Sequence, residues 1–542
     1  MKKMFTRPLA LLTLVALAAC SGSSNSTSAP AAVPPQTGNS ILTTIVGVGD
    51  SLTAGVESGG LLGDPTATSP ASNVLPGNAV PPTQENGFFY LLTAQAKGAT
   101  AAQAAVPLIK APGLGSQLVY NTATFIAPSH PSCDSFNQAA FALSSASTTQ
   151  LSTSAPANLD LGIPGITTHE ALTMNNPLTG PAAPPGCTYP VIPGDPTSGS
   201  LQTLLSSESN NFYPVLYRYA SSVSPLTEVG AAVSAKPTLA TVWLGANDIL
   251  HYTFSGGLAT FVDTPQQFQT DLTSIVTQLQ HAGARVVVAN LPDILSTPQF
   301  TKVSNLSNAI AATYNNLGLA ALTAQGKFPP LAALQAEVPA TQSYLQTTYG
   351  VGPNGYLLES GYLTTIGAIA TALATSTSPA PALDPSGKGS GMGSVYLIDS
   401  FAATVSSMNT AYNGAITNVA SATGAPLVDI HAIFAGITAA GNVACIDGSA
   451  PPNCNGQPGP AGSKVTLNLF GGLTSLDGLH PSNTGYALIA NAYIQTIDTA
   501  FGVSGASLPP LGAVQIATIK GTDPNLIIQF PTPLAPTGGI PQ

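Results

Sequence analysis

Residues 43–52 read TTIVGVGDSL, an apolar run that stops abruptly at glycine, aspartate and serine. A short, continuous apolar run bounded by turn residues predicts a strand that is buried on both faces, as in a parallel sheet. Ser51 then lies at the carboxyl end of that strand, the edge where the active-site groups of open α/β sheets gather. Because turns of this kind are also common without any function, the interpretation depends on partners elsewhere in the chain.

Later segments carry the same kind of buried strand, joined to helices. Residues 239–244 are apolar, and a helical face of apolar residues then runs from Thr264 to Gly283, where the apolar run 284–289 begins. This order predicts a strand, a helix and a parallel strand. Further elements of this kind are a helical face at 405–424, a strand at 426–430 and a helix after Ser482. Together they predict an α/β fold, with a doubly wound parallel sheet in a three-layer α/β/α sandwich.

Three long stretches interrupt this pattern, and we expect large loop insertions there. They lie near 57–151, 174–236 and 350–395. Loops of this length in a compact domain are usually functional or contain small elements of their own. The third includes SGKGSG at 386–391, which lacks the Gly-Lys-Ser/Thr ending of a phosphate-binding loop and therefore predicts a flexible loop.

Polar motifs occur at two further places. Gly245-Ala246-Asn247-Asp248 comes directly after the apolar run 239–244, and Asp477 and His480 lie three residues apart just before the last predicted helix. In their chain order, these motifs and Gly49-Asp50-Ser51-Leu52 resemble the GDSL or SGNH family of serine esterases and lipases. The resemblance implies a flavodoxin-like SGNH hydrolase fold.

The family has one more sequence block, a glycine after a small apolar stretch, and its match in this chain is looser. Residues 161–168 read LGIPGITT and are similar to this block, with Gly165 as the functional glycine, whereas Asp160 stands where the family usually has asparagine. The matching blocks are short and scattered. They favour one large hydrolase domain over 41–505 that contains the three insertions.

The resemblance implies roles for individual residues. Ser51 is the nucleophile, His480 is the base that takes its proton, and Asp477 orients the imidazole. The backbone N–H groups of Ser51 and Gly165 and the side chain of Asn247 form the oxyanion hole. Reaction with an ester then passes through an acyl-enzyme.

Several of these positions also have a structural interpretation. Gly165 could simply let the chain turn at a positive φ, and Asn247 could cap the helix that follows it. Asp293 and Asp429 end predicted strands, and either could replace Asp477 as the acid.

Other polar residues near these motifs have no place in the predicted mechanism. We expect Asp50 and Asp248 to order their loops by accepting hydrogen bonds from backbone amides. The remaining histidines have no motif partner and are expected to be surface or hydrogen-bonded buried residues: His130, His169, His251, His281 and His431.

The resulting hypothesis is a serine hydrolase that cleaves carboxylic esters, with acyl lipids, small esters or O-acetylated glycans as substrates. One alternative is an acyltransferase that uses the same triad, and another is a non-catalytic surface binding protein on the same fold. A typical α/β-hydrolase is disfavoured, because the chain lacks the Gly-x-Ser-x-Gly motif. The hypothesis implies no metal and no organic cofactor.

The amino-terminal end has the pattern of a secreted lipoprotein. Basic residues precede a short apolar run and Leu17-Ala18-Ala19-Cys20, which predicts a lipoprotein signal peptide over 1–19. The context of Cys20 resembles a bacterial lipobox, which implies a lipid anchor on this cysteine. The mature protein would lie in the bacterial cell envelope, in the periplasm or at the outer-membrane surface. We expect a Ser/Pro-rich linker over 20–40 and a Pro/Gly-rich tail over 506–542.

The composition excludes one class of partner. Charged residues make up 7% of the 542 residues, against about a quarter in ordinary soluble domains, so hydroxyl and amide groups must wet the surface. The net charge is −10, and no cluster of Lys and Arg follows the predicted signal peptide. Binding to a phosphate backbone therefore lacks its main electrostatic attraction, and we expect no nucleic-acid partner.

Four cysteines remain besides Cys20, an even number in a chain that is expected to reach an oxidising compartment: Cys133, Cys187, Cys445 and Cys454. Three pairings are possible, and proximity in sequence favours the first with the second and the third with the fourth. Each such disulfide would stabilise the fold by about 2–4 kcal/mol. Zinc binding is the alternative, but the spacing of cysteines and histidines does not support it.

Overall fold

The computed structural model describes several parts of the chain. They are residues 38–57, 61, 84–108, 159–173, 227–254, 257, 263–383, 396–439, 466–469, 471–475 and 477–523.

The main sheet is parallel throughout its four strands. In spatial order these are β1 (Ile45–Gly49), β2 (Leu239–Trp243), β3 (Arg285–Ala289) and β7 (Leu427–Val428). The first two strands are buried along their whole length, as their continuous apolar runs predicted. The register pairs Gly49 with Trp243, so β1 and β2 end side by side.

Residues 159–163 occupy a fifth position in this sheet, on the other side of β1. Asp160 forms a parallel bridge with Gly47, and the N–H of Leu161 donates to the carbonyl oxygen of Gly47 at 2.9 Å. Counted in chain order, this segment is the second strand, and the spatial order becomes 2-1-3-4-5. That is the flavodoxin-like order, whose switch point between the first and third strands is where such folds bind ligands.

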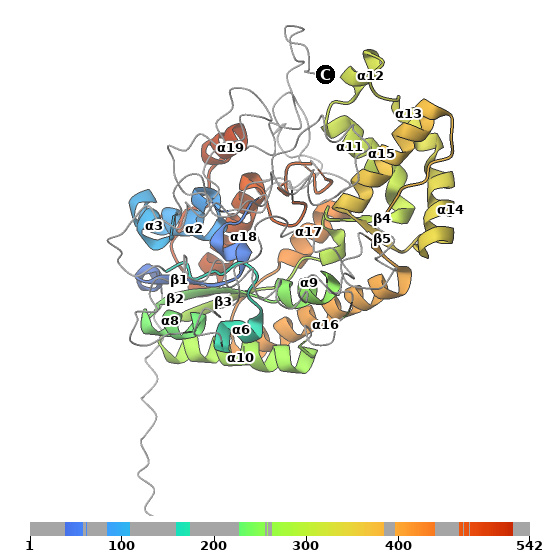
Figure 1. Ribbon diagram of the computed structural model, residues 1–542. Coiled ribbons are helices and arrows are strands. Elements are labelled where there is room, and N and C mark those ends of the chain that lie inside the picture. The colour runs from blue at the N-terminus through green and yellow to red at the C-terminus, as the bar shows by residue number, and fades with distance from the viewer. Residues whose placement is uncertain are drawn as a thin grey trace, which may run out of the picture.

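Helices cover both faces of the sheet (Figure 1). One layer consists of α6 (Thr168–Thr173), α8 (Glu228–Ser234), α10 (Pro265–His281) and α16 (Asp399–Thr423). The opposite layer consists of α2 (Phe88–Lys97), α3 (Ala99–Ala105), α18 (Asn483–Phe501) and α19 (Ala513–Thr522). This confirms the predicted α/β fold with a parallel sheet between two helical layers.

Shorter elements connect these layers. They are η1 (Gly38–Leu42), α1 (Ser51–Ala54), η3 (Gln84–Asn86), α9 (Ala246–Phe254), η5 (Ile294–Ser296), η6 (Val303–Asn305) and α17 (Ile430–Ala439).

The ends of the long helices follow from their capping residues. The side chain of Thr264 accepts a hydrogen bond from the N–H of Gln267 at the start of α10. Ser482 caps α18 in the same way, and α16 ends at Gly424, whose φ is 67°. A capping side chain of this kind stabilises a helix by about 1 kcal/mol. These boundaries confirm the helices predicted after Thr264 and Ser482.

Aromatic side chains join the sheet to its two helical layers. Phe88 of α2 stacks on Tyr493 of α18, with 4.7 Å between ring centroids, and meets the edge of Trp243 of β2 at 5.5 Å. On the opposite face, Phe268 of α10 stacks on Tyr412 of α16 at 4.3 Å. All five side chains are buried, and each contact of this kind adds about 0.5–1.5 kcal/mol to the area that it buries.

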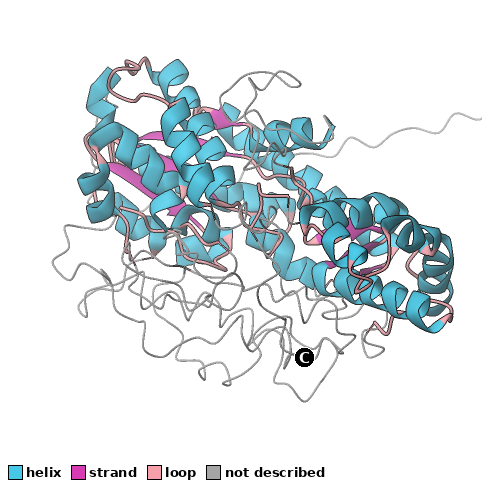
Figure 2. Cartoon of the chain, turned by 90° about the horizontal axis from the view of Figure 1, so that it is seen from above, coloured by secondary structure: helices cyan, strands magenta, loops and turns pink. Residues whose placement is uncertain are grey.

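A second, smaller unit lies beside the main sheet (Figure 2). It contains an antiparallel sheet of β4 (Phe300–Lys302), β5 (Tyr356–Leu358) and β6 (Tyr396–Leu397). Its helices are α11 (Leu306–Asn316), α12 (Ala320–Ala324), α13 (Leu331–Ala336), α14 (Val338–Tyr349) and α15 (Glu359–Thr375). Leu306, Leu345 and Tyr362 belong to its separate hydrophobic core. This unit begins well before the insertion that we expected near 350–395.

Two other expected insertions contain parts of the helical layers. Within 57–151, α2 and α3 pack against each other and α2 packs against α18; within 174–236, α8 contacts β1. α2 begins with five consecutive large apolar residues, and α3 and α8 consist mostly of small residues, so none of these helices has a clear helical period in the sequence. Within these two stretches, residues 58–60, 62–83, 109–151 and 174–226 lie outside the described residues, as does the glycine-rich segment 386–391.

The expected tail over 506–542 also begins with ordered structure. Ile516 and Ile519 of α19 are buried in the main core. The carboxylate of Asp523 accepts hydrogen bonds from the N–H and the hydroxyl of Thr484, at 2.8 and 2.6 Å. This part of the chain is therefore a helix that supports the start of α18, and residues 524–542 lie outside the described range. None of the described helices is both long enough and apolar enough to cross a membrane.

Candidate active site

Ser51 is the first residue of α1, directly after β1. The side chain of Asp50 caps this short helix by accepting a hydrogen bond from the N–H of Leu52 at 2.9 Å. Because the first N–H groups of a helix have no carbonyl partner inside it, the N–H of Ser51 points out of the helix end. The serine is 8% exposed and lies at the carboxyl edge of the sheet, as predicted.

Asp477 and His480 are hydrogen bonded to each other. Their Oδ2 and Nδ1 atoms are 2.7 Å apart. The other carboxylate oxygen accepts the backbone N–H groups of Leu479 and His480, both at 2.9 Å, and the hydroxyl of Ser475 at 3.0 Å. This tight turn fixes the orientation of the imidazole.

The same contacts keep Asp477 ionised. Burial alone would raise its pKa, but the charge of His480 and the hydrogen bonds from His480 and Leu479 outweigh burial and hold the pKa below its ordinary value of 3.8. An anionic partner favours the imidazolium form of His480. The pair therefore has the electrostatics that a histidine base needs when it takes up a proton.

The loop that carries His480 is attached to the turn that carries Ser51. Tyr486 of α18 is buried, and its hydroxyl donates to the carbonyl oxygen of Val56 at 2.7 Å. His480 also lies close enough to Asp50 for its charge to lower the pKa of that carboxyl. The structure thus brings the first and last sequence motifs to the same place.

Asn247 lies between two turns at this edge. It belongs to the first turn of α9, and its Nδ2 donates to the carbonyl oxygen of Ile166 at 3.1 Å and to Oδ2 of Asp50 at 3.3 Å. These bonds join the Ser51 turn, the Gly165 turn and the start of α9. The side chain is 7% exposed.

Gly165 has a φ of 82°, a left-handed conformation that favours glycine. This requirement supports the structural interpretation of the residue. Its N–H forms no hydrogen bond to any of the described residues. The Gly165 turn is therefore compatible with both the structural role and the oxyanion role. The left-handed conformation that needs glycine also leaves a backbone donor available beside Asn247.

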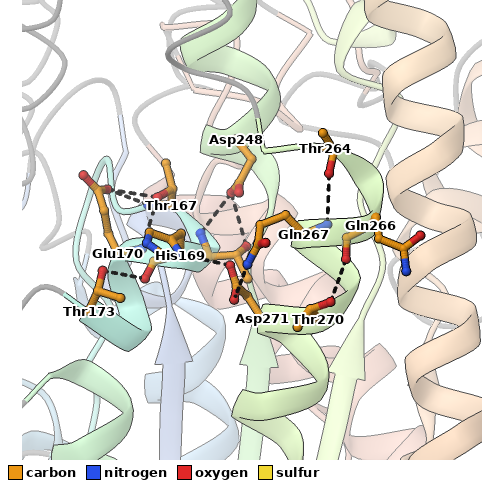
Figure 3. A network of polar contacts seen from close by, with 11 residues as sticks. Thr167, His169, Glu170, Thr173, Asp248, Thr264, Gln266, Gln267, Thr270 and Asp271 are labelled. Atoms are coloured by element: carbon orange, nitrogen blue, oxygen red, sulfur yellow. Dashed lines mark hydrogen bonds and ion pairs between the residues drawn. The ribbon is translucent and has the colours of Figure 1, made fainter.

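Asp248 connects the Gly165 turn to α9. Its Oδ2 accepts the N–H and the hydroxyl of Thr168 at 3.1 and 3.2 Å. Nearby, Nδ1 of His169 is 3.0 Å from Asp271 of α10, which also accepts a bond from Gln267 (Figure 3). The predicted loop-ordering role of Asp248 is consistent with these bonds, but the pairing of His169 with Asp271 had no signal in the sequence.

Several carboxyl groups near the Ser51 turn are buried. Burial raises the pKa of Asp50 to about 7, and it raises the pKa values of Asp160 and Glu228 well above their ordinary values. Oε1 of Glu228 accepts the N–H of Gly49 at 2.6 Å. Sequence reasoning missed Glu228, because it lies on a short helix far from every motif.

These acids predict that the protein loses stability as the pH rises. Burial raises the pKa values of Asp50 and Asp248 from 3.8 to about 7. Between these two values the two carboxyls hold more protons in the folded protein than in the unfolded chain, so their contribution to stability is fully present below 3.8 and is lost as the pH rises through 7. Buried His251 has the opposite effect on stability. Its pKa is lowered from 6.5 to about 4, so its contribution to the free energy of unfolding rises with pH between these two values.

Urea unfolding at constant ionic strength should therefore give a free energy of unfolding that falls between about pH 6.5 and about pH 8, where His251 no longer contributes. In Asp248→Asn the slope should be shallower, because one buried carboxyl no longer titrates. A free energy of unfolding that rises across this interval would contradict the prediction.

The two alternative acids have other partners. Asp293 caps η5 by accepting the N–H of Leu295 at 3.1 Å. Asp429 accepts Nδ2 of Asn290 at 2.7 Å and the N–H of Ala432 at 2.9 Å. These bonds fit loop-ordering roles, and Asp477 is the carboxylate bonded to the motif histidine.

The five cysteines predicted as lipidation and disulfide sites lie in other parts of the chain. Cys20, Cys133, Cys187, Cys445 and Cys454 all lie outside the described residues. Within the described part of the chain, no group of three or more His, Cys, Asp and Glu residues is arranged to hold a metal ion.

The fold and the site together define a class of protein. A flavodoxin-like sheet gathers Ser51, Asn247 and His480 at its carboxyl edge, which is the arrangement of an α/β enzyme that acts on esters, as a hydrolase or an acyltransferase. Residues 170–338 match the family model described as GDSL-like Lipase/Acylhydrolase. This segment of the chain is therefore similar to the GDSL/SGNH family. The matched segment includes Asn247 and precedes His480, and Ser51 precedes the segment. Comparison with curated proteins and with solved structures gave no match.

Proposed function

We propose that the protein is a serine hydrolase that cleaves carboxylic esters through Ser51, His480 and Asp477. The observation that carries the proposal is the 2.7 Å bond between Asp477 and His480, on a loop attached to the Ser51 turn. The family match supports the general kind of activity. The specific triad is our inference from the geometry.

Proton transfer begins the reaction. A serine hydroxyl is a poor nucleophile at neutral pH, so Nε2 of His480 accepts the Ser51 proton as the oxygen attacks the ester carbonyl. Asp477 is bonded to the opposite ring nitrogen, which fixes the tautomer and stabilises the imidazolium. The imidazolium then gives its proton to the departing alcohol, and water hydrolyses the acyl-enzyme by the same steps.

Three donors stabilise the oxyanion in this scheme: the N–H groups of Ser51 and Gly165 and Nδ2 of Asn247. In the free protein, both hydrogens of Nδ2 already have acceptors, Ile166 and Asp50. The bond to Asp50 is the longer one, at 3.3 Å. We propose that this hydrogen turns to the oxyanion, while the bond to Ile166 holds the amide in place.

Asn247→Ala should lower kcat by about 10²- to 10³-fold and change KM little, because the oxyanion exists only in the transition state and the intermediate. Asn290→Ala is the matched control. Its amide is also buried at the carboxyl edge and bonded to a carboxylate, that of Asp429, and its activity should stay close to that of the wild type. Equal losses in both variants would rule out the oxyanion role.

The substrate is a carboxylic ester, and acyl lipids, small esters and O-acetylated glycans are the three classes that we propose to screen. Transfer of the acyl group to an alcohol other than water is the alternative reaction of the same acyl-enzyme. Adding acceptor alcohols and identifying the products separates hydrolysis from transfer.

We propose that the enzyme is anchored in the bacterial cell envelope by lipid on Cys20. The support is the sequence 17–20 after a short apolar run. Cys20→Ser should move the protein from the membrane fraction to the soluble fraction of the producing cells. Continued membrane association of this variant would exclude the cysteine-linked anchor.

Active-site labelling tests the proposed nucleophile directly. The purified protein is treated with a fluorophosphonate probe, and the labelled residue is located by peptide mass mapping. Labelling at Ser51 that is lost in His480→Ala supports the proposal. If a folded wild-type protein is not labelled, the protein lacks an accessible, activated serine, and the non-catalytic binding protein is favoured instead.

A further inference from the structure

The loop that carries Asp477 and His480 lies against the polypeptide that enters the second unit. The N–H of Gln299, the residue before β4, donates to the carbonyl oxygen of Gly478 at 3.0 Å. Gly478 has a φ of 67°, and a Cβ there would lie 2.7 Å from the backbone nitrogen of Gln299. Only glycine permits this contact, so the two backbones meet directly beside the catalytic pair.

The side chain of Gln299 reaches the same loop. It is 3% exposed, and its amide faces the carbonyl oxygen of Asp477 and a carboxyl oxygen of Glu359. A backbone carbonyl oxygen can only accept a hydrogen bond, so the amide is oriented with its nitrogen toward it. In this orientation Nε2 donates to the Asp477 oxygen at 2.8 Å and to Oε2 of Glu359 at 3.3 Å.

Glu359 begins α15 of the second unit and is buried. Burial, together with the nearby charge of Asp477, raises the pKa of Glu359 well above its ordinary value. Asp477, in contrast, has a lowered pKa, so the two carboxyls release their protons in different pH ranges. Glu359 accepts the far hydrogen of the Gln299 amide and so connects the second unit to the loop of Asp477.

We propose that Gln299 is a positioning residue for the catalytic acid. Its amide fixes the peptide between Asp477 and Gly478, so that the carboxylate of Asp477 stays against Nδ1 of His480. The second unit thereby supports the triad through Gln299 and Glu359. This inference rests on the proposed function for the roles of Asp477 and His480.

The test replaces Gln299 with methionine, which has nearly the same shape and no donor. The backbone bond from residue 299 to Gly478 remains. We expect kcat to fall by about 10- to 100-fold with KM nearly unchanged, because a small displacement of the acid weakens catalysis more than binding. The acid limb of the pH profile should move to lower pH, since the imidazolium of His480 loses support from Asp477, whereas the charge of nearby Asp50 is not altered by the substitution.

Gln342→Met is the matched control. Gln342 belongs to the same unit, and its Nε2 also donates to a backbone carbonyl oxygen, that of Val303, at 2.7 Å. It should keep wild-type kcat and the wild-type pH profile. Gln299→Asn withdraws the amide by one methylene and should show a weaker form of the Gln299→Met effect. It replaces the methionine variant in this test if that variant does not fold.

An NMR titration of the His480 ring separates this inference from the proposed function, because it needs no activity. A lower His480 pKa in Gln299→Met than in wild type and Gln342→Met supports the positioning role, even if fluorophosphonate labelling fails. An unchanged His480 pKa, or a loss of kcat with an unshifted acid limb, overturns the positioning role, even if Ser51 is the nucleophile.

Discussion

Ser51→Ala should reduce ester hydrolysis by about 10⁶-fold in kcat, to a rate set by the oxyanion donors and substrate binding alone. Alanine removes only the hydroxyl oxygen that forms the acyl-enzyme. Ser51 lies at the start of a helix that is capped by Asp50, and this capping bond does not involve the serine side chain. The fold should therefore be retained, and circular dichroism and urea unfolding should match those of the wild type.

The matched control for this variant is Ser296→Ala. Ser296 follows β3 near the same edge of the sheet, and its hydroxyl donates to the carbonyl oxygen of Asp293 at 2.6 Å. This variant loses a local hydrogen bond and should hydrolyse esters at close to the wild-type rate. Retained hydrolysis in Ser51→Ala would mean that another residue is the nucleophile, and the mechanism would be wrong.

Asp477→Asn should lower kcat by about 10⁴-fold. An asparagine amide has about the same size, but it removes the negative charge that stabilises the imidazolium of His480. It can also present its nitrogen to Nδ1 of His480, which favours the wrong tautomer. The loss should appear mainly in kcat, because Asp477 is 9% exposed and contacts the histidine loop.

The alternative acids provide two controls for this experiment. The controls are Asp293→Asn and Asp429→Asn. Both carboxylates follow strands of the main sheet and, like that of Asp477, accept hydrogen bonds from nearby groups. Both variants should keep kcat within about threefold of the wild type, since surface and loop substitutions usually have small effects. A loss of about 10⁴-fold in either of them, with an active Asp477→Asn, would identify a different acid.

Local patterns were sufficient to predict the main sheet and its long helices. The apolar runs at β1 and β2 are continuous because these strands are buried on both faces, and Thr264 and Ser482 cap the helices that they were predicted to start. The motif around Asp477 and His480 was also readable, because both residues belong to one turn. Each of these features depends on residues that are close in sequence.

The features that sequence analysis missed depend on distant contacts. The strands of the second unit have two or three residues each, too few to show a periodic pattern. Glu228 lies far along the chain from Gly49, and Gln299 lies far from Asp477, so nothing local links either residue to the active site. The position of Asp160 beside Gly47 likewise follows only from the assembled sheet.

The aromatic group of Phe88, Trp243 and Tyr493 has a practical consequence. Trp243 is the single tryptophan of the chain, and its ring lies 6.4 Å from that of Tyr493 on the helix that follows the His480 loop. Its fluorescence therefore comes from one known position between β2, α2 and α18. Separation of α18 from the sheet would expose this indole to water and shift its emission to the red, which gives an intrinsic optical signal for whether the carboxyl-terminal part of the proposed triad is in place.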